Sequence, residues 1–252
     1  MRKFLSKTFL SAIFGIFLLL AFSGCIYVDF TSQRTIIMGT GDLVRYDIPL
    51  GEFDQIRIGG YFELHYHNEP SLANRAVLEI QSNLREYIQI EIVNGELQIS
   101  TERGANINPT LTPVINIYNP SIKGLIITGA VDFRSHDIIK ADNFYLNISG
   151  AGNGNAVLDV NSLELIVSGA GNFNLSGKTG DINLRMSGAG NVDAMELESR
   201  TGSVNFSGAG TVRVNSTEML DIRANGVGTV VYRGSPRLTI NNSGMVSIRS
   251  ID

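Results

Sequence analysis

The sequence predicts an all-β protein, in which N-terminal antiparallel strands and a hairpin lead into a β-helix-like solenoid with repeats of about 19 residues. Three observations predict this fold class. The tetrapeptide Ser-Gly-Ala-Gly recurs at a nearly constant spacing, apolar and polar residues alternate around each copy, and no segment after residue 24 keeps a helical period over three turns. With 43% hydrophobic and 17% charged residues, the 252-residue chain can bury a core and is not a disordered protein.

Residues 46–120 form the predicted N-terminal β region, a series of short strands. Polar and apolar residues alternate in the runs 55–58, 62–66, 77–80, 88–92, 96–99 and 114–118. Asn94-Gly95 separates two of these runs, and both residue types tolerate the positive φ that a two-residue hairpin turn requires. We therefore expect a β-hairpin at this dipeptide, and a turn or a single helical turn at 83–87.

From residue 121 onward the chain repeats. Ser-Gly-Ala-Gly occurs at 149–152, 168–171, 187–190 and 207–210, with spacings of 19, 19 and 20 residues. Degenerate copies at 128–130, 225–228 and 243–244 bring the series to about seven. A period near 20 residues in a β-rich sequence is typical of a solenoid. Residues 121–252 are therefore the predicted solenoid, with six or seven coils.

Alignment of the copies places apolar residues in columns with the period of two that a β-strand has. In a solenoid such columns stack at about 4.8 Å and form a continuous core. The predicted core columns contain Leu165, Val167, Leu184, Met186, Val204 and Phe206 before the motif, and Phe173, Val192, Val212 and Val230 after it. The Gly and Ala residues of the motif suit the tight corners of such a short coil.

The outward positions also form columns, and one of them is the candidate binding face. It contains Asn147, Arg185, Asn205, Arg223 and Asn241. Arginine offers a planar fork of donors and asparagine offers both a donor and an acceptor, so a regular array of them suits a linear polymer with hydroxyl or carboxylate groups. The alternative is an exposed sheet face that is polar only because it contacts water.

A second outward column follows the motif and contains Asn153, Asn172 and Asn191. We favour a structural interpretation of these residues, because stacked asparagine amides can hydrogen-bond to one another along a solenoid axis.

Residues 1–24 have the three parts of an export signal. Arg2, Lys3 and Lys7 precede an apolar run of about 14 residues, which as a helix is about 21 Å long and too short for the ~30 Å hydrocarbon core of a membrane. The sequence Phe-Ser-Gly-Cys at 22–25 resembles the bacterial lipobox, with Phe in place of the commoner Leu. That resemblance implies cleavage between Gly24 and Cys25, lipidation of Cys25 and anchoring in a membrane. The alternative is a plain secretory signal followed by a free cysteine.

Few residues suggest catalysis or metal binding. His65 and His67 lie two positions apart on one predicted strand and face the same side, which makes them candidate metal ligands beside Glu63. Without a third ligand, an exposed strand face explains them better, and His136 stands alone in the sequence. No G-x-S-x-G or H-E-x-x-H motif is present, and Asp159, Asp181, Asp193 and Asp221 fall at different positions of the repeat. We expect neither a cofactor nor a catalytic site.

Several segments together resemble one known family. They are Phe-Asp-Gln-Ile at 53–56, Asn-Gly-Glu-Leu at 94–97, the serial Ser-Gly-Ala-Gly motifs and Val-Tyr-Arg-Gly-Ser-Pro at 231–236. Over residues 46–249 the chain is similar to the head GIN domain family of auto-transporter adhesins, which is common among Bacteroidetes lipoproteins. The resemblance implies an all-β fold that ends in a solenoid. It implies no activity and supplies no catalytic residue.

These observations divide the chain into a lipoprotein signal peptide (1–24), a tether (25–45), the N-terminal β region (46–120) and the solenoid (121–252). Removal of the signal leaves 24 acidic against 17 basic residues, a balance that disfavours nucleic-acid binding. We expect a non-catalytic lipoprotein of the cell envelope, anchored in the outer membrane on its periplasmic face or at the cell surface, that binds a glycan or an envelope protein. A structural lipoprotein without a ligand and a carbohydrate-active enzyme on a β-helix are the alternatives.

Overall fold

The computed structural model describes residues 35–251, so the expected signal segment 1–24, its cleavage after Gly24 and the lipid attachment at Cys25 lie outside the described residues. The described part is built from strands and contains two short 3-10 helices, η1 (Pro70–Leu72) and η2 (Ser82–Tyr87). The second confirms the helical turn expected at 83–87. Among the described residues, no helix is long and apolar enough to cross a membrane.

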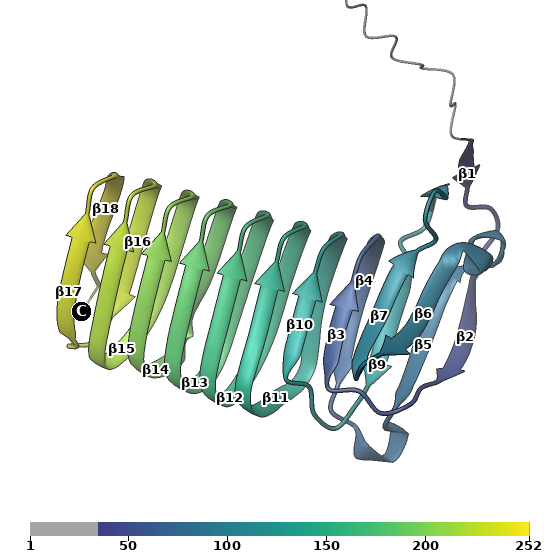
Figure 1. Cartoon of the computed structure of the whole chain (residues 1–252), viewed down its shortest axis with the longest axis horizontal. Helices are drawn as coiled ribbons and strands as arrows, with labels where there is room; N and C mark the ends of the chain where they lie inside the picture. The colour runs from purple at the N-terminus through teal and green to yellow at the C-terminus, as the bar shows by residue number, and fades with distance from the viewer. Residues whose placement is uncertain (1–34, 252) are drawn as a thin grey trace, which may run out of the picture. The chain divides into compact units, whose positions relative to one another are not determined.

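The predicted solenoid is confirmed, with about seven turns. Its strands are β10 (Gly124–Ile127), β11 (Ala130–Ile148), β12 (Ala151–Val167), β13 (Ala170–Met186), β14 (Ala189–Phe206), β15 (Ala209–Ala224), β16 (Val227–Arg233), β17 (Arg237–Asn242) and β18 (Met245–Ser250). Each coil pairs in parallel with the next one, so the chain winds as a regular stack (Figure 1).

The strands before the solenoid are β1 (Ile36–Met38), β2 (Leu43–Pro49), β3 (Gln55–Ile58), β4 (Tyr61–His67), β5 (Arg75–Gln81), β6 (Ile88–Val93), β7 (Glu96–Thr101), β8 (Asn106–Asn108) and β9 (Val114–Tyr118). The pairs β2–β5, β5–β9 and β6–β7 are antiparallel. Asn94 and Gly95 join β6 to β7 with φ of 53° and 80°, which confirms the predicted hairpin turn.

The parallel stack takes in more of the chain than the repeats show. Strand β3 pairs in parallel with β10, and β4 pairs in parallel with β11, so together they form a coil whose corner is Gly59-Gly60. Strands β5 to β9 lie between this coil and the next one in the sequence, and this insertion hides the repeat period. The segment expected as a tether likewise contains β1 and the first residues of β2.

The strand registers reproduce the predicted columns. Leu165 lies opposite Leu184, and Leu184 lies opposite Val204, while Phe173 lies opposite Val192. The six predicted core residues before the motif, Leu165, Val167, Leu184, Met186, Val204 and Phe206, are all buried, with exposed fractions of 1% or less. They belong to one continuous hydrophobic core that extends from the N-terminal strands into the last coils.

The glycine corners let successive coils approach backbone to backbone. At the corner after β13, Ser187 N donates to Val167 O over 2.9 Å and Ala189 N donates to Gly169 O over 3.0 Å. Gly190 has a φ of +132°, and a Cβ atom placed on it would overlap the carbonyl oxygen of Gly171 on the neighbouring coil. The corner therefore requires glycine both for its dihedral angle and for the lack of a side chain.

Replacement of Phe206 by alanine is expected to lower the free energy of unfolding by about 3–5 kcal/mol, because it leaves a cavity in a fully buried column. The measurement is urea unfolding followed by circular dichroism. Met219→Ala is the matched control, since Met219 is 51% exposed and its truncation opens no cavity. Equal losses for the two variants would contradict the assigned coil register.

Gly190→Ala is expected to destabilise the protein more than Gly104→Ala does. Both glycines have positive φ, which costs an alanine about 1–2 kcal/mol. Only at Gly190 would the added Cβ also meet a backbone oxygen, whereas no atom lies within 4 Å of a Cβ at Gly104. Thermal unfolding of the two variants measures the difference. Equal melting temperatures would show that the neighbouring coil accommodates a Cβ atom at Gly190 without loss of stability.

Candidate functional site

The glycine corners divide each coil into two outward surfaces. We call the surface built from segments that precede a corner, such as 163–167, the pre-corner face, and the surface built from segments that follow it, such as 153–157, the post-corner face. The predicted binding column lies on the pre-corner face. The groove described below lies on the post-corner face.

The predicted column on the pre-corner face is in register from coil to coil. Asn147, Arg185, Asn205, Arg223 and Asn241 occupy equivalent positions, with Ile166 between the first two. Its two arginines are paired with acids of the same face: Arg185 Nη1 lies 2.7 Å from Glu164 Oε1, and Arg223 Nη2 lies 2.9 Å from Asp221 Oδ2. A ligand on this face would have to replace these exposed ion pairs, each of which is worth about 0–1 kcal/mol.

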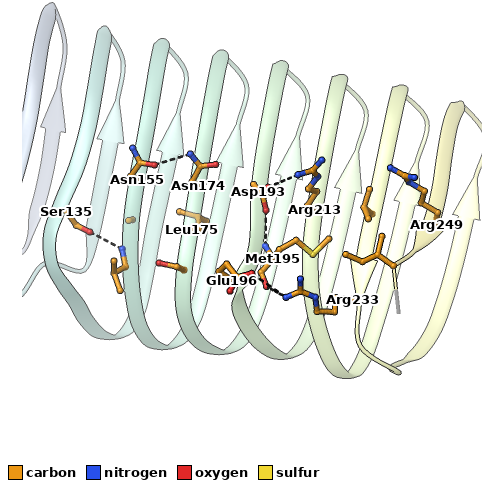
Figure 2. Close-up of a pocket in the computed structure, with 15 residues that line it drawn as sticks. Ser135, Asn155, Asn174, Leu175, Asp193, Met195, Glu196, Arg213, Arg233 and Arg249 are labelled. Atoms are coloured by element: carbon orange, nitrogen blue, oxygen red, sulfur yellow. Dashed lines mark hydrogen bonds and ion pairs between the residues drawn. The ribbon is translucent and has the colours of Figure 1, made fainter.

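A groove with a volume of 610 Å³ runs across several coils of the post-corner face (Figure 2). Its polar lining includes Asn155, Asn174, Asp193, Arg213 and Arg249, which lie in a single column from β12 to β18, with Val231 of β16 between the two arginines. Buried apolar side chains, among them Leu175, Met195 and Val231, line the same groove.

The charges of the groove are partly compensated within it. Arg213 Nη1 lies 3.0 Å from Asp193 Oδ2, and Arg233 Nη1 lies 3.4 Å from Glu196 Oε1. Arg249 is exposed, and no carboxylate of the described residues lies within 4.0 Å of its guanidinium nitrogens. Among the described residues, the groove is therefore lined by three arginines and two acids, and Arg249 is the arginine without an ion pair.

A bulge at Met195 organises these side chains. On β14, Ala194 and Met195 lie opposite the single residue Leu175 of β13. The Met195 N–H donates to Asp193 Oδ1 over 3.1 Å, and Asp193 in turn holds Arg213. The Met195 carbonyl accepts a hydrogen bond from Arg233 over 3.3 Å. One extra residue thus positions both ion pairs of the groove.

The groove was not predicted from the sequence, although a signal for it exists. The spacing between the motifs at 187 and 207 is 20 residues instead of 19, and the extra residue is the bulge at Met195. The spacing of 21 residues between Thr128 and Ser149 marks a second bulge, at 135–137 in β11. A coil that is longer than 19 residues therefore indicates where a strand bulges and the column of outward side chains is interrupted.

The column of asparagines beside the groove has the structural role that we favoured. Asn172 Nδ2 donates to Asn153 Oδ1 over 3.1 Å, and Asn191 Nδ2 donates to Asn172 Oδ1 over 2.7 Å. Each amide thus uses a donor or an acceptor on the neighbouring coil. Asn153 itself donates to Asp132 over 3.0 Å, which extends the ladder to β11.

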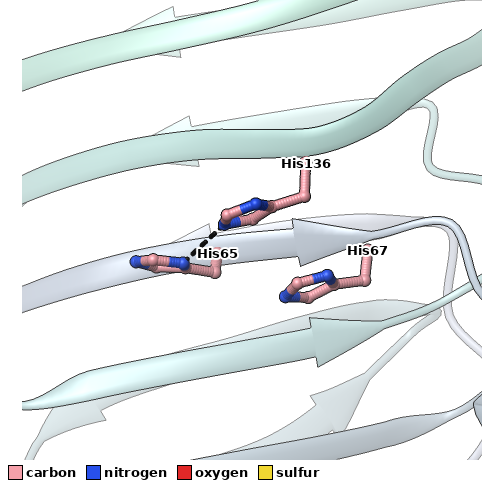
Figure 3. Close-up of side chains that lie close together, drawn as sticks. All are labelled: His65, His67 and His136. Atoms are coloured by element: carbon pink, nitrogen blue, oxygen red, sulfur yellow. Dashed lines mark hydrogen bonds between the residues drawn. The ribbon is translucent and has the colours of Figure 1, made fainter.

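The expectation that His136 stands alone was wrong. Residue Tyr66 on β4 pairs with Ser135 on β11, and this register places His136 beside His67. His65, His67 and His136 offer ring nitrogens that all lie within 4.8 Å of one another (Figure 3). Desolvation, followed by the charges of His67, His65 and Arg134, lowers the pKa of His136 below its usual value.

A parallel β-solenoid with an antiparallel N-terminal region and a surface groove is the architecture of a repeat protein that presents long, regular faces. The family model described as "Putative auto-transporter adhesin, head GIN domain" matches residues 52–236. The chain belongs to this family, which confirms the resemblance found in the sequence. The description of the family points to adhesion, which is a function of cell-envelope and surface proteins, and it names no enzymatic activity.

Solved structures of three proteins support the fold. A "putative adhesin" from Bacteroides fragilis is 24% identical with a TM-score of 0.82, and the match covers 85% of this chain and 100% of that one. A "putative lipid binding protein" and a "putative adhesin", both from Parabacteroides distasonis, are 19% and 17% identical with TM-scores of 0.68 and 0.67, over 86% of this chain and all of theirs. No curated protein matches the chain.

Proposed function

We propose that this protein is a non-catalytic, lipid-anchored adhesin of the cell envelope, and that the groove on its post-corner face binds an elongated glycan that bears carboxylate groups. The observation that carries the proposal is the column Asn155, Asn174, Asp193, Arg213, Val231 and Arg249, which lines an open groove and ends in an arginine that has no ion pair among the described residues.

The geometry of the groove favours an extended ligand. Successive coils place one side chain of the column about every 4.8 Å, so the groove offers a row of contacts rather than a single deep pocket. Asn155 and Asn174 can exchange hydrogen bonds with sugar hydroxyls, and Arg249 can take a carboxylate in its planar fork. Leu175 and Met195 add an apolar floor that suits the apolar faces of sugar rings, although both side chains are largely buried.

The same groove does not favour glycoside hydrolysis. That chemistry uses two carboxyl groups on either side of the scissile bond, one of them a free acid. Asp193 and Glu196 are the carboxylates that line the groove, and each forms an ion pair with an arginine. Membership of an adhesin family agrees with a binding role.

The anchor belongs to the proposal on the strength of the lipobox-like sequence at 22–25. Lipidation of Cys25 would attach the solenoid to the outer membrane through three acyl chains, a much stronger anchor than one chain. The mature protein would then stand on the periplasmic face or at the cell surface, where envelope glycans are within reach.

Arg213→Ala combined with Arg249→Ala is expected to weaken glycan binding about ten-fold or more, because each arginine removed takes charge-assisted hydrogen bonds worth about 1.5–3 kcal/mol from a carboxylate. The measurement is a glycan array with the 26–252 fragment, followed by titration of the glycans that bind. Both side chains lie on the surface, so the melting temperature should change little.

Arg185→Ala combined with Arg223→Ala is the matched control, because it removes two exposed arginines from the pre-corner face. Binding that survives this change and is lost in the groove variant supports the proposal. The reverse result would assign the ligand to the column Asn147, Arg185, Asn205, Arg223 and Asn241. If no glycan binds the wild-type fragment, the groove is not a glycan site.

Cys25→Ser is expected to release the protein from the membrane fraction, because serine lacks the thiol to which the lipid is attached. Intact-mass measurement of the wild-type protein should show the mass of three acyl chains at a mature N-terminus that begins with Cys25. Protease treatment of whole cells then distinguishes the cell surface from the periplasmic face. A serine variant that stays fully with the membranes would contradict the anchor.

A further inference from the structure

All three histidines of the sequence meet at one place on the post-corner face. His65 and His67 lie on β4, and His136 lies on the neighbouring strand β11, about 70 residues later in the chain (Figure 3). His65 Nδ1 and His136 Nε2 share a hydrogen bond of 2.7 Å. The rings of His67 and His136 stack with centroids 4.6 Å apart, and Tyr118 stacks on the other side of His67.

The remaining nitrogens of the β4 histidines already have partners of the kind that orient metal ligands. His65 Nε2 lies 2.9 Å from Glu63 Oε1, and His67 Nε2 lies 3.1 Å from Asn116 Oδ1. Both partners accept hydrogen bonds through oxygen, so each holds its ring with the proton on Nε2. This leaves the lone pair of each ring on Nδ1, and that of His65 accepts the hydrogen bond from His136 Nε2. A carboxylate behind a histidine is a common outer partner in metal sites, where it fixes the ring and raises its basicity.

The bulge at 135–137 gives His136 its position and keeps the cluster open. Three residues of β11 lie opposite the single residue Ala156 of β12, so His136 has no counterpart on the next coil. The bulge is fixed at both ends: Ser135 Oγ accepts a hydrogen bond from Val157 N over 2.9 Å, and Asp137 Oδ2 accepts one from Asn68 N over 3.1 Å. The backbone that carries His136 is therefore held beside β4, and its exposed ring lies against the rings of His65 and His67.

We propose that His65 Nδ1, His67 Nδ1 and His136 Nε2 form a binding site for a divalent transition-metal ion of the zinc type. Two imidazole nitrogens on a tetrahedral Zn²⁺ are about 3.4 Å apart, since each Zn–N bond is about 2.0–2.1 Å. The hydrogen-bonded nitrogens of His65 and His136 are 2.7 Å apart, so the ion takes the place of the shared proton after a small separation. That proton moves to Nδ1 of His136, and the stacked rings rotate about χ2 to aim at the ion.

The ligand set determines the kind of ion. Three imidazoles suit Zn²⁺, Ni²⁺ and Cu²⁺, whereas Ca²⁺ and Mg²⁺ require mostly oxygen ligands. The fourth position is open to water or to a carboxylate of a bound molecule. The site joins β4 of the first coil to β11 of the second. An ion bound there therefore links two coils that are neighbours in space but are separated in the sequence by the insertion β5–β9.

The test is isothermal titration of Zn²⁺ into the full chain in detergent, purified without a histidine tag. We expect one Zn²⁺ per chain, a rise in melting temperature on addition of Zn²⁺, and the visible absorption bands of tetrahedral Co²⁺ when Co²⁺ is used as the probe. His136→Ala should weaken Zn²⁺ binding by at least about ten-fold, and Glu63→Gln should weaken it by about 10–100-fold, as loss of an outer partner does elsewhere.

Lys140→Ala is the matched control, because it removes another exposed side chain of β11 and should leave the affinity for Zn²⁺ unchanged. His136 is itself exposed, so its variant should keep the circular dichroism spectrum and melting temperature of the metal-free wild type. The proposal is wrong if the wild-type chain binds no stoichiometric Zn²⁺, or if the His136 variant binds it with unchanged affinity. Neither result depends on glycan binding in the groove.

Discussion

The close approach of backbone to backbone at the glycine corners is the constraint on which the rest of this structure depends. At each corner the N–H groups of one coil donate to carbonyls of the coil before it, and a Cβ on the motif glycines would overlap those carbonyls. The stacked corners hold each coil in register with its neighbours. Register in turn decides which side chains enter the core, because a shift of one residue would turn every apolar column outward.

Much of the fold could be predicted because every coil of the solenoid repeats the same motif and the same alternation of apolar and polar residues. The motif spacing and the alternating apolar residues identify the coils, and columns such as Leu165, Leu184 and Val204 are buried as expected. The first coil escaped prediction for a physical reason. Its corner, Gly59-Gly60, lacks the full motif, and strands β5 to β9 separate it from the coil on which it packs, so no fixed period connects the two.

The candidate sites were harder to predict, because they arise where the repeat is broken. An array of identical outward positions, such as the asparagine ladder, satisfies its own hydrogen bonds from coil to coil and leaves little for a ligand. The bulges at Met195 and at 135–137 interrupt this pairing and redirect side chains. Sequence reasoning placed His65 and His67 on one face. Only the parallel pairing of β4 with β11 brings His136 to them, and that pairing joins residues about 70 positions apart.

The two bulges give one face of the solenoid a different character from the other. Both faces pair arginines with their own acids, as Arg185 does with Glu164 and Arg213 does with Asp193, but only the post-corner face carries the groove that Arg249 lines and the three histidines. Both bulges leave the neighbouring core columns buried, as Leu165, Leu184 and Val204 show. The solenoid can therefore vary its post-corner face through insertions of one or two residues, while the glycine corners preserve the coil. Differences in coil length among members of the family would then mark the positions of their binding surfaces.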